Sequence, residues 1–223
     1  MRVLVINPVG HSTWNESDRV LYKRFLPSDV HVDVVSLPRG PTTVETAEAY
    51  REAAALVVER GRELFSGYDG TIVNCFLDPG VEELRYKTKS VVIGAGEASL
   101  TLAKLYGHPI YIITVGAEEE TLNLMWERVV KLGFEKIVAD IVGVPFGVMD
   151  IDRDRERTLS LLFNAAKSVT SKRSGEKVTI VLGCTGFGGI AEELQNLVKM
   201  PVVDPVKASA LLMVSLLRLL LKD

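Results

Sequence analysis

The sequence predicts an α/β fold made of two similar halves, each built on a four-stranded parallel sheet. Short β-branched apolar runs alternate with longer amphipathic segments, as in chains where parallel strands alternate with helices. Most of the short runs are continuously apolar, which is typical of strands covered on both faces. Three segments of the first half also recur about 110 residues later, which indicates an internal duplication.

The first half is expected to contain four strands and a long helix. The helix covers Thr43–Phe65, where apolar side chains form one stripe and Glu and Arg residues lie opposite it. The predicted strands are Val3–Asn7, Val30–Ser36, Thr71–Cys75 and Val91–Ile93.

The second half repeats this alternation of strands and helices. Its strands are expected at Ile110–Val115, Lys136–Val142, Val178–Leu182 and Val202–Val203. The amphipathic segments that predict its helices are Glu118–Leu132, Asp152–Ser171, Gly188–Val198 and Val206–Leu221.

The duplication sets the expected domain boundary. Equivalent segments lie 108, 109 and 110 residues apart, and they pair Val3–Asn7 with Tyr111–Val115, Thr71–Cys75 with Ile180–Cys184, and Val92–Ser99 with Val202–Ser209. Gly107, His108 and Pro109 break the helical pattern between the halves. We therefore expect one α/β half at 1–106 and a second at 107–223, and it stays open whether the last helix of each half packs on the other half.

Composition and charge exclude several classes of function. The net charge is −3 and aromatic residues make up 7% of the chain, so the basic surface and the stacking platforms of a nucleic-acid binder are missing. The most apolar stretch, Ala208–Leu221, is shorter than the ~20 residues of a membrane span and contains Arg218. We interpret it as a buried helix or a contact in a homo-oligomer. No signal-peptide pattern follows the first strand, so a cytoplasmic location is expected.

The chain has two cysteines, and they occupy equivalent places in the two halves. Cys75 ends the predicted third strand of the first half and Cys184 ends its counterpart, and each is followed by turn residues and then a helix. In open α/β sheets the ligand crevice lies outside the carboxyl ends of the strands. Two such halves facing each other would place one thiol on each side of a cleft, close to helix N-termini that favour a thiolate. No Cys or His spacing suggests a metal site.

An isolated cysteine is most often a small buried hydrophobe. A matched pair with no other cysteine instead favours a catalytic role for Cys75 and Cys184. Two opposed thiols suit racemisation next to a carbonyl, because one removes a proton from one face and the other returns a proton to the opposite face. The enolate-like intermediate needs hydrogen-bond donors. The candidate donors, which we predict bind the substrate, are backbone N–H groups of Phe76, Leu77, Thr185 and Gly186 and side chains of Asn7, Thr114 and Thr185.

Several motifs resemble those of the hydantoin racemase family, within the aspartate/glutamate racemase superfamily. They span residues 6 to 205 and comprise Ile6-Asn7-Pro8, Gly40-Pro41-Thr42-Thr43-Val44-Glu45, Cys75-Phe76-Leu77-Asp78-Pro79-Gly80, Gly94-Ala95-Gly96-Glu97-Ala98, Leu182-Gly183-Cys184-Thr185-Gly186-Phe187 and Pro201-Val202-Val203-Asp204-Pro205. The resemblance implies two flavodoxin-like halves with the active site in a cleft between them, and racemisation by a cysteine pair without a cofactor. It also implies 5-monosubstituted hydantoins, or the related compound allantoin, as small-molecule substrates.

Two other functions remain open at this point. Amino-acid racemases of the superfamily usually have Asn-Thr after the first cysteine, where this chain has Phe76-Leu77. The segments expected at the cleft contain only Arg39 and Asp78 as fixed charges, which suits a neutral hydantoin better than an amino acid. The alternative of another class is a non-catalytic small-molecule-binding protein, because the fold alone does not define a function.

Overall fold

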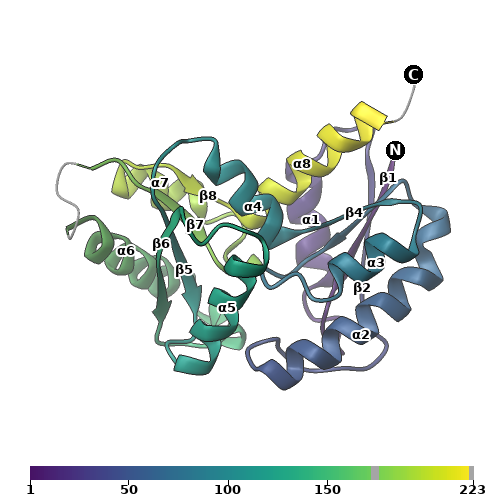
Figure 1. Cartoon of the computed structure of the whole chain (residues 1–223), viewed down its shortest axis with the longest axis horizontal. Coiled ribbons are helices and arrows are strands. Elements are labelled where there is room, and N and C mark those ends of the chain that lie inside the picture. The colour runs from purple at the N-terminus through teal and green to yellow at the C-terminus, as the bar shows by residue number, and fades with distance from the viewer. Residues whose placement is uncertain (172–175, 221–223) are drawn as a thin grey trace. The chain divides into compact units, whose positions relative to one another are not determined.

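The computed structural model describes residues 1–171 and 176–220, and within them it contains two parallel four-stranded sheets (Figure 1). The strand orders are β2-β1-β3-β4 and β6-β5-β7-β8, so the two sheets have the same topology. The predicted α/β class with two four-stranded parallel sheets is therefore confirmed. In each sheet the third strand, β3 or β7, is followed by a turn that carries a cysteine.

The first sheet is covered by helices on both faces. Its strands are β1 (Arg2–Asn7), β2 (His31–Ser36), β3 (Gly70–Val73) and β4 (Val91–Gly94), and the helices around it are α1 (Asn15–Phe25), α2 (Ala47–Leu64), α3 (Val81–Lys87) and α8 (Pro205–Leu220). Leucine and valine side chains of α2 and α3 pack on Leu4, Ile6 and Val73 on one face. On the other face the chain at Gly70 lies against Met213 and Leu217 of α8.

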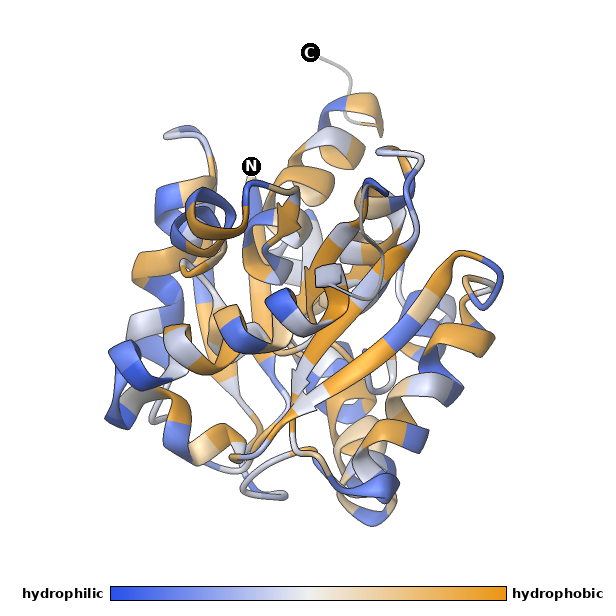
Figure 2. Cartoon of the chain, turned by 90° about the vertical axis from the view of Figure 1, so that its left-hand side faces the viewer, coloured by the Kyte–Doolittle hydropathy of each residue, from blue (hydrophilic) through white to orange (hydrophobic). Residues whose placement is uncertain are grey.

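The second sheet has an equivalent core. Its strands are β5 (Ile110–Val115), β6 (Val138–Val144), β7 (Thr179–Leu182) and β8 (Val202–Val203), and its α-helices are α5 (Glu119–Lys131), α6 (Arg155–Ser171) and α7 (Ala191–Val198). Leu162 of α6 and Leu194 of α7 are fully buried against Ile113, Ile180 and Leu182 of the sheet. α5 packs beside β6. The strands are apolar over most of their length, whereas the helices alternate apolar and polar segments (Figure 2).

The chain divides into two compact units that differ in detail from the duplication. One unit is Met1–Ala98 with the described residues from Val206 onward, and the other is Ser99–Pro205. The boundary falls inside helix α4 (Ala95–Lys104), which follows β4, and α8 belongs to the first unit although it follows β8 of the second sheet. Each unit is therefore completed by chain from the other side of the duplication.

The sheet registers refine the duplication. Val3 pairs with Gly70 in the first sheet and Ile110 pairs with Thr179 in the second, so the first strands are related by an offset of 107 and not the predicted 108. Apolar runs look alike when shifted by one residue, and only hydrogen-bond register separates the two choices. The corrected offset makes Asn7 the equivalent of Thr114.

The predicted elements agree with the structure except at their ends and in the short helices of the first half. No residue range was predicted for α1 or α4, and α3 was expected only as a helix after the turn that carries Cys75. These helices have 11, 10 and 7 residues, and two or three turns offer few repeats of an apolar stripe. The last predicted residue of the final helix, Leu221, lies outside the described residues. Among the described helices, none is long and apolar enough to cross a bilayer. The cytoplasmic location stays a prediction.

Candidate active-site turns after β3 and β7

Cys75 lies two residues beyond the end of β3, in a turn tied to the sheet by backbone hydrogen bonds. The N–H of Asn74 donates to the carbonyl of Ile6 on β1 at 2.9 Å, and the N–H of Asp78 donates to the carbonyl of Cys75 at 3.0 Å. Cys75 is partly exposed and forms no disulfide within the described residues. The sequence predicted that the strand ends at Cys75. In the structure the strand ends at Val73, and Cys75 belongs to the turn.

Two buried backbone N–H groups follow this thiol. Phe76 is 2% exposed and Leu77 is 4% exposed, and no hydrogen-bond acceptor for either N–H occurs among the described residues. Buried backbone donors are almost always paired in folded proteins. This turn can therefore supply two adjacent donors to an anionic or carbonyl oxygen.

Asp78 holds the turn against the start of helix α4. Its fully buried carboxylate accepts hydrogen bonds from the N–H groups of Gly96 at 2.7 Å and Glu97 at 2.8 Å. A carboxylate at this place satisfies donors that a helix leaves unpaired at its N-terminus. A Cβ at Gly94 would lie 2.0 Å from the Asp78 carboxylate, so the glycine makes room for it. Asp78 therefore caps α4 from 18 positions earlier in the chain.

Cys184 lies two residues beyond β7 and directly precedes the short 3₁₀ helix η3 (Thr185–Phe187). Like Cys75, it is partly exposed and outside any disulfide of the described chain. The backbone of Gly186 is exposed, its N–H has no acceptor among the described residues, and a Cβ there would lie 3.5 Å from the Cys184 sulfur. Thr185 is partly exposed in the same turn. This turn presents a thiol and a backbone donor side by side.

A carboxylate also holds the second turn, but here it lies after the neighbouring strand and not on the turn itself. Asp204, at the end of β8, accepts a hydrogen bond from the N–H of Gly189 at 2.6 Å. The sequence offset of 110 makes Asp204 the equivalent of Gly94. In the first half the carboxylate is on the cysteine turn and glycine is at the strand end, and in the second half the two are exchanged.

The predicted donors Asn7 and Thr114 are buried, and their side-chain protons are already used. Asn7 donates from Nδ2 to Asn15 at 3.1 Å and to Asp18 at 2.8 Å. The Thr114 hydroxyl donates to the carbonyl of Gly183 at 3.1 Å. In this arrangement neither side chain has an N–H or O–H left for a substrate, whereas the backbone donors in the two turns remain available.

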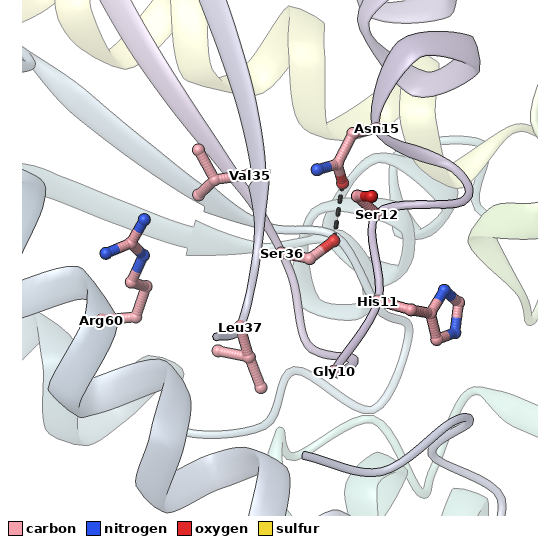
Figure 3. Close-up of a pocket in the computed structure, with 8 residues that line it drawn as sticks. All are labelled: Gly10, His11, Ser12, Asn15, Val35, Ser36, Leu37 and Arg60. Atoms are coloured by element: carbon pink, nitrogen blue, oxygen red, sulfur yellow. Dashed lines mark hydrogen bonds between the residues drawn. The ribbon is translucent and has the colours of Figure 1, made fainter. Parts of the chain in front are cut away.

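A hollow of about 410 Å³ lies in the first unit, at the carboxyl ends of β1 and β2 (Figure 3). Its lining residues are Gly10, His11, Ser12, Asn15, Val35, Ser36, Leu37 and Arg60. The Ser36 hydroxyl donates to Asn15 at 2.6 Å, and His11 contacts the carbonyl of Thr42 at 3.0 Å. In the close-up, Arg60 and His11 lie on opposite sides of the edge strand β2 (Figure 3).

The fixed charges expected near the site are engaged elsewhere. Arg39 pairs with Glu59 at 3.6 Å, and its side chain is 70% exposed. Asp78 is occupied at the start of α4, as described above. Among the described residues, no group of three or more His, Cys, Asp or Glu side chains is arranged to hold a metal ion.

Comparison with known proteins identifies the family. The sequence profile described as Asp/Glu/Hydantoin racemase matches residues 3–213. A hydantoin racemase of Paenarthrobacter aurescens is 30% identical over 98% of this chain and 92% of that protein. The chain belongs to the Asp/Glu/hydantoin racemase family. It is therefore an isomerase that acts on a small molecule, and the family predicted from the sequence motifs is confirmed.

Solved structures agree with this assignment. An allantoin racemase from Klebsiella pneumoniae has a TM-score of 0.87 and 25% identity, covering 98% of this chain and 88% of that one. An allantoin racemase from Pseudomonas fluorescens has a TM-score of 0.90 at 23% identity, covering 98% and 92% of the two chains. The second similarity concerns the fold alone.

Sequence reasoning missed the residues that support the cysteine turns. Asp18 and Tyr22 lie on α1, a helix that was not predicted, and both are hydrogen-bonded to Asn74 next to Cys75. Asp204 was noticed only as part of a motif. An aspartate or asparagine next to a strand end is a weak signal, because such residues usually cap helices or form turns.

Proposed function

We propose that this chain is a cofactor-independent racemase of 5-monosubstituted hydantoins or allantoin-like compounds, with Cys75 and Cys184 as its two acid–base groups. The observation that carries the proposal is the equivalence of the two cysteine turns. Each follows the third strand of its sheet, each holds a partly exposed cysteine outside any disulfide, and each has a backbone N–H beside that cysteine with no acceptor in the described part of the chain. A pair of equivalent thiols suits a reaction that must work on both faces of one carbon.

In the proposed reaction one cysteine is a thiolate and the other a thiol. The thiolate removes the proton from the carbon next to the carbonyl, the electron pair of the broken C–H bond forms the C=C bond of the enolate, and the π pair of the carbonyl moves onto its oxygen. The second thiol then gives its proton to the opposite face of that carbon, and the carbonyl re-forms. Proton and charge balance without an oxidant or reductant, and the second enantiomer reacts with the roles of the cysteines exchanged.

Backbone N–H groups are the proposed partners of the enolate oxygen. Those of Phe76, Leu77 and Gly186 lack an acceptor among the described residues, and Thr185 adds a hydroxyl in the second turn. Preorganised donors of this kind contribute several kcal/mol to transition-state stabilisation, about 2.7–4 for one donor. Asn7 and Thr114, which were predicted to bind the substrate, would then act by holding the strand ends.

The charge distribution supports a neutral substrate. A hydantoin ring has two carbonyls and two N–H groups and no full charge. An amino acid would bring a carboxylate and an ammonium group, which normally call for charged partners. Arg39 is paired with Glu59 at the surface and Asp78 is enclosed at α4, so the cysteine turns carry no other fixed charge among residues 74–80 and 183–189.

The proposal is tested by following optical rotation with single enantiomers of a 5-substituted hydantoin, allantoin, aspartate and glutamate. We expect racemisation of a hydantoin or allantoin and none of the two amino acids. Cys75→Ser and Cys184→Ser should each lower the rate by about 1000-fold or more, because a hydroxyl is a poor base at neutral pH. The unfolding midpoint of each variant serves as the folding control. Turnover of aspartate or glutamate alone, or full activity in both serine variants, would contradict the proposal.

The homo-oligomer expected from the apolar last helix remains a prediction. Leu211 and Leu219 on α8 are 45% and 80% exposed, which leaves apolar surface available on this helix. Light scattering of the purified protein measures the oligomeric state directly.

A further inference from the structure

A polar network lies beneath the turn that carries Cys75. Asn74, the residue before the cysteine, donates from Nδ2 to the Oδ1 of Asn7 at 2.8 Å and to the Oδ2 of Asp18 at 3.2 Å. Its Oδ1 accepts a hydrogen bond from the buried Tyr22 hydroxyl at 3.0 Å. Asn7 donates to the same carboxylate oxygen of Asp18 at 2.8 Å. One half-buried carboxylate on α1 thus binds the ends of both β1 and β3.

The hydrogen bonds leave the two asparagines little freedom. Both N–H groups of Asn74 and its oxygen are engaged, and the same holds for Asn7, whose second N–H reaches Asn15. Asn74 is 5% exposed and Asn7 is 3% exposed, so water offers no ready replacement for a lost partner. Buried networks that are fully satisfied hold one conformation, and they become costly when one member is removed.

The second half differs at the equivalent place. The residue before Cys184 is Gly183, which has no side chain, and a Cβ added there would lie 2.7 Å from Ile112 and 2.9 Å from Thr114. Thr114, the equivalent of Asn7, donates to the backbone carbonyl of Gly183 and not to a side chain. The two cysteine turns are therefore alike in backbone but are held by different interactions.

We propose that Asp18 is a positioning residue for Cys75, and that it acts through Asn7 and Asn74 on this thiol and not on Cys184. The inference rests on the proposed function, because it assumes that Cys75 exchanges protons with the substrate. Asp18 itself contacts the asparagines that precede the turn. Its removal should displace the Cys75 thiol from the substrate carbon and leave the Cys184 turn unchanged.

Net racemisation cannot show which thiol is displaced. The equilibrium constant between two enantiomers is one, so kcat/KM must be equal in the two directions for every variant. Exchange of the α-hydrogen with solvent deuterium has no such constraint. When Cys75 is displaced, the enantiomer whose proton Cys184 removes can still exchange with retention, whereas the other enantiomer cannot be deprotonated.

The experiment compares Asp18→Ala with Cys75→Ser and Cys184→Ser, using each enantiomer of the hydantoin in D₂O at neutral pH. We expect Asp18→Ala to lower kcat by about 10- to 100-fold and to change KM little. A displacement of a reacting group by about 1 Å can lower a catalytic rate by up to about 100-fold. The enantiomer that still exchanges should be the one that survives in Cys75→Ser. Asp18→Asn can place its amide oxygen where Oδ2 accepts both bonds, so it should recover most of the activity.

Asp33→Ala is the matched control. Asp33 is another partly buried aspartate of the same unit, and it accepts hydrogen bonds from Arg2 at 3.1 Å and Tyr68 at 3.0 Å, away from the cysteine turn. It should lose comparable stability and show no difference between the enantiomers. Equal loss of exchange on both enantiomers in Asp18→Ala, or the pattern of Cys184→Ser, would overturn the inference.

A second measurement does not depend on any substrate. Iodoacetamide labelling followed by peptide mass spectrometry gives a separate rate for each cysteine. In Asp18→Ala the rate at Cys75 should change at least about threefold, because reactivity follows the environment of the thiol, and the rate at Cys184 should stay constant. Unchanged labelling of Cys75 would refute the positioning role even if Cys75→Ser abolishes activity. Failure of both serine variants to lose activity would instead refute the proposed function.

Discussion

Gly96→Ala is predicted to damage both stability and activity, although alanine is the better helix former. Gly96 is the second residue of α4, where its N–H donates to Asp78. A Cβ at this position would lie 1.9 Å from the backbone carbonyl oxygen of Phe76 and 3.0 Å from the Asp78 carboxylate. Contacts shorter than 3.0 Å are not tolerated, so the Phe76 carbonyl or the helix must move by about 1 Å.

The magnitudes decide the sign of the effect. Replacing glycine by alanine inside a helix stabilises it by about 1 kcal/mol. Overpacking a site that cannot give way costs about 1–3 kcal/mol or more, and here the obstacle is backbone and not a flexible side chain. A rigid obstacle places the cost near the upper end of this range, so we expect a net loss of about 2 kcal/mol in the free energy of unfolding. Since Phe76 follows Cys75 directly, a shift of about 1 Å should also lower kcat by up to about 100-fold.

Urea unfolding and the racemisation assay measure the two effects, with Gly67→Ala as the control. Gly67 ends the short 3₁₀ helix η1 (Phe65–Gly67) and is exposed, and beyond its chain neighbours the only described atom within 4 Å of a Cβ added there is Nη1 of Arg2 at 3.8 Å. This control should change stability by less than about 1 kcal/mol and leave activity intact, because the added methyl group meets no obstacle. If Gly96→Ala were as stable and as active as the wild type, the reasoning about the turn would be refuted.

Two further predictions concern the thiols and a tyrosine. Iodoacetamide should inactivate the protein, and bound substrate should slow the inactivation; inactivation that substrate does not slow would count against thiol catalysis. The racemisation rate plotted against pH should be bell-shaped, because one cysteine must be ionised and the other protonated. Burial, and then the hydrogen bond to Asp33, raises the pKa of Tyr68, so its stabilising contribution is complete below the unfolded value of about 10 and is lost as pH rises through the folded value. Absorbance titration should show a late-ionising tyrosine that Tyr68→Phe removes, and an unchanged titration curve would contradict this.

The family and the fold class were available from the sequence because both depend on local patterns. Continuous β-branched runs such as Ile110–Val115 specify buried strands wherever the chain places them. The matched positions of Cys75 and Cys184 are visible because a duplication preserves spacing along the chain. Residues that follow a strand end in a parallel sheet share one edge of that sheet, so the cysteine turns could be predicted without coordinates.

Only the tertiary structure decided which residues support those turns. Asp18 and Asn74 are 56 positions apart, and Asp78 reaches α4 from 18 positions away, so no local pattern connects them. The strand offset of 107 in place of 108 depended on backbone pairing, to which apolar composition is insensitive. Helix α8 follows the second sheet along the chain and yet packs with the first unit, because buried apolar surface is matched in three dimensions and not in sequence order.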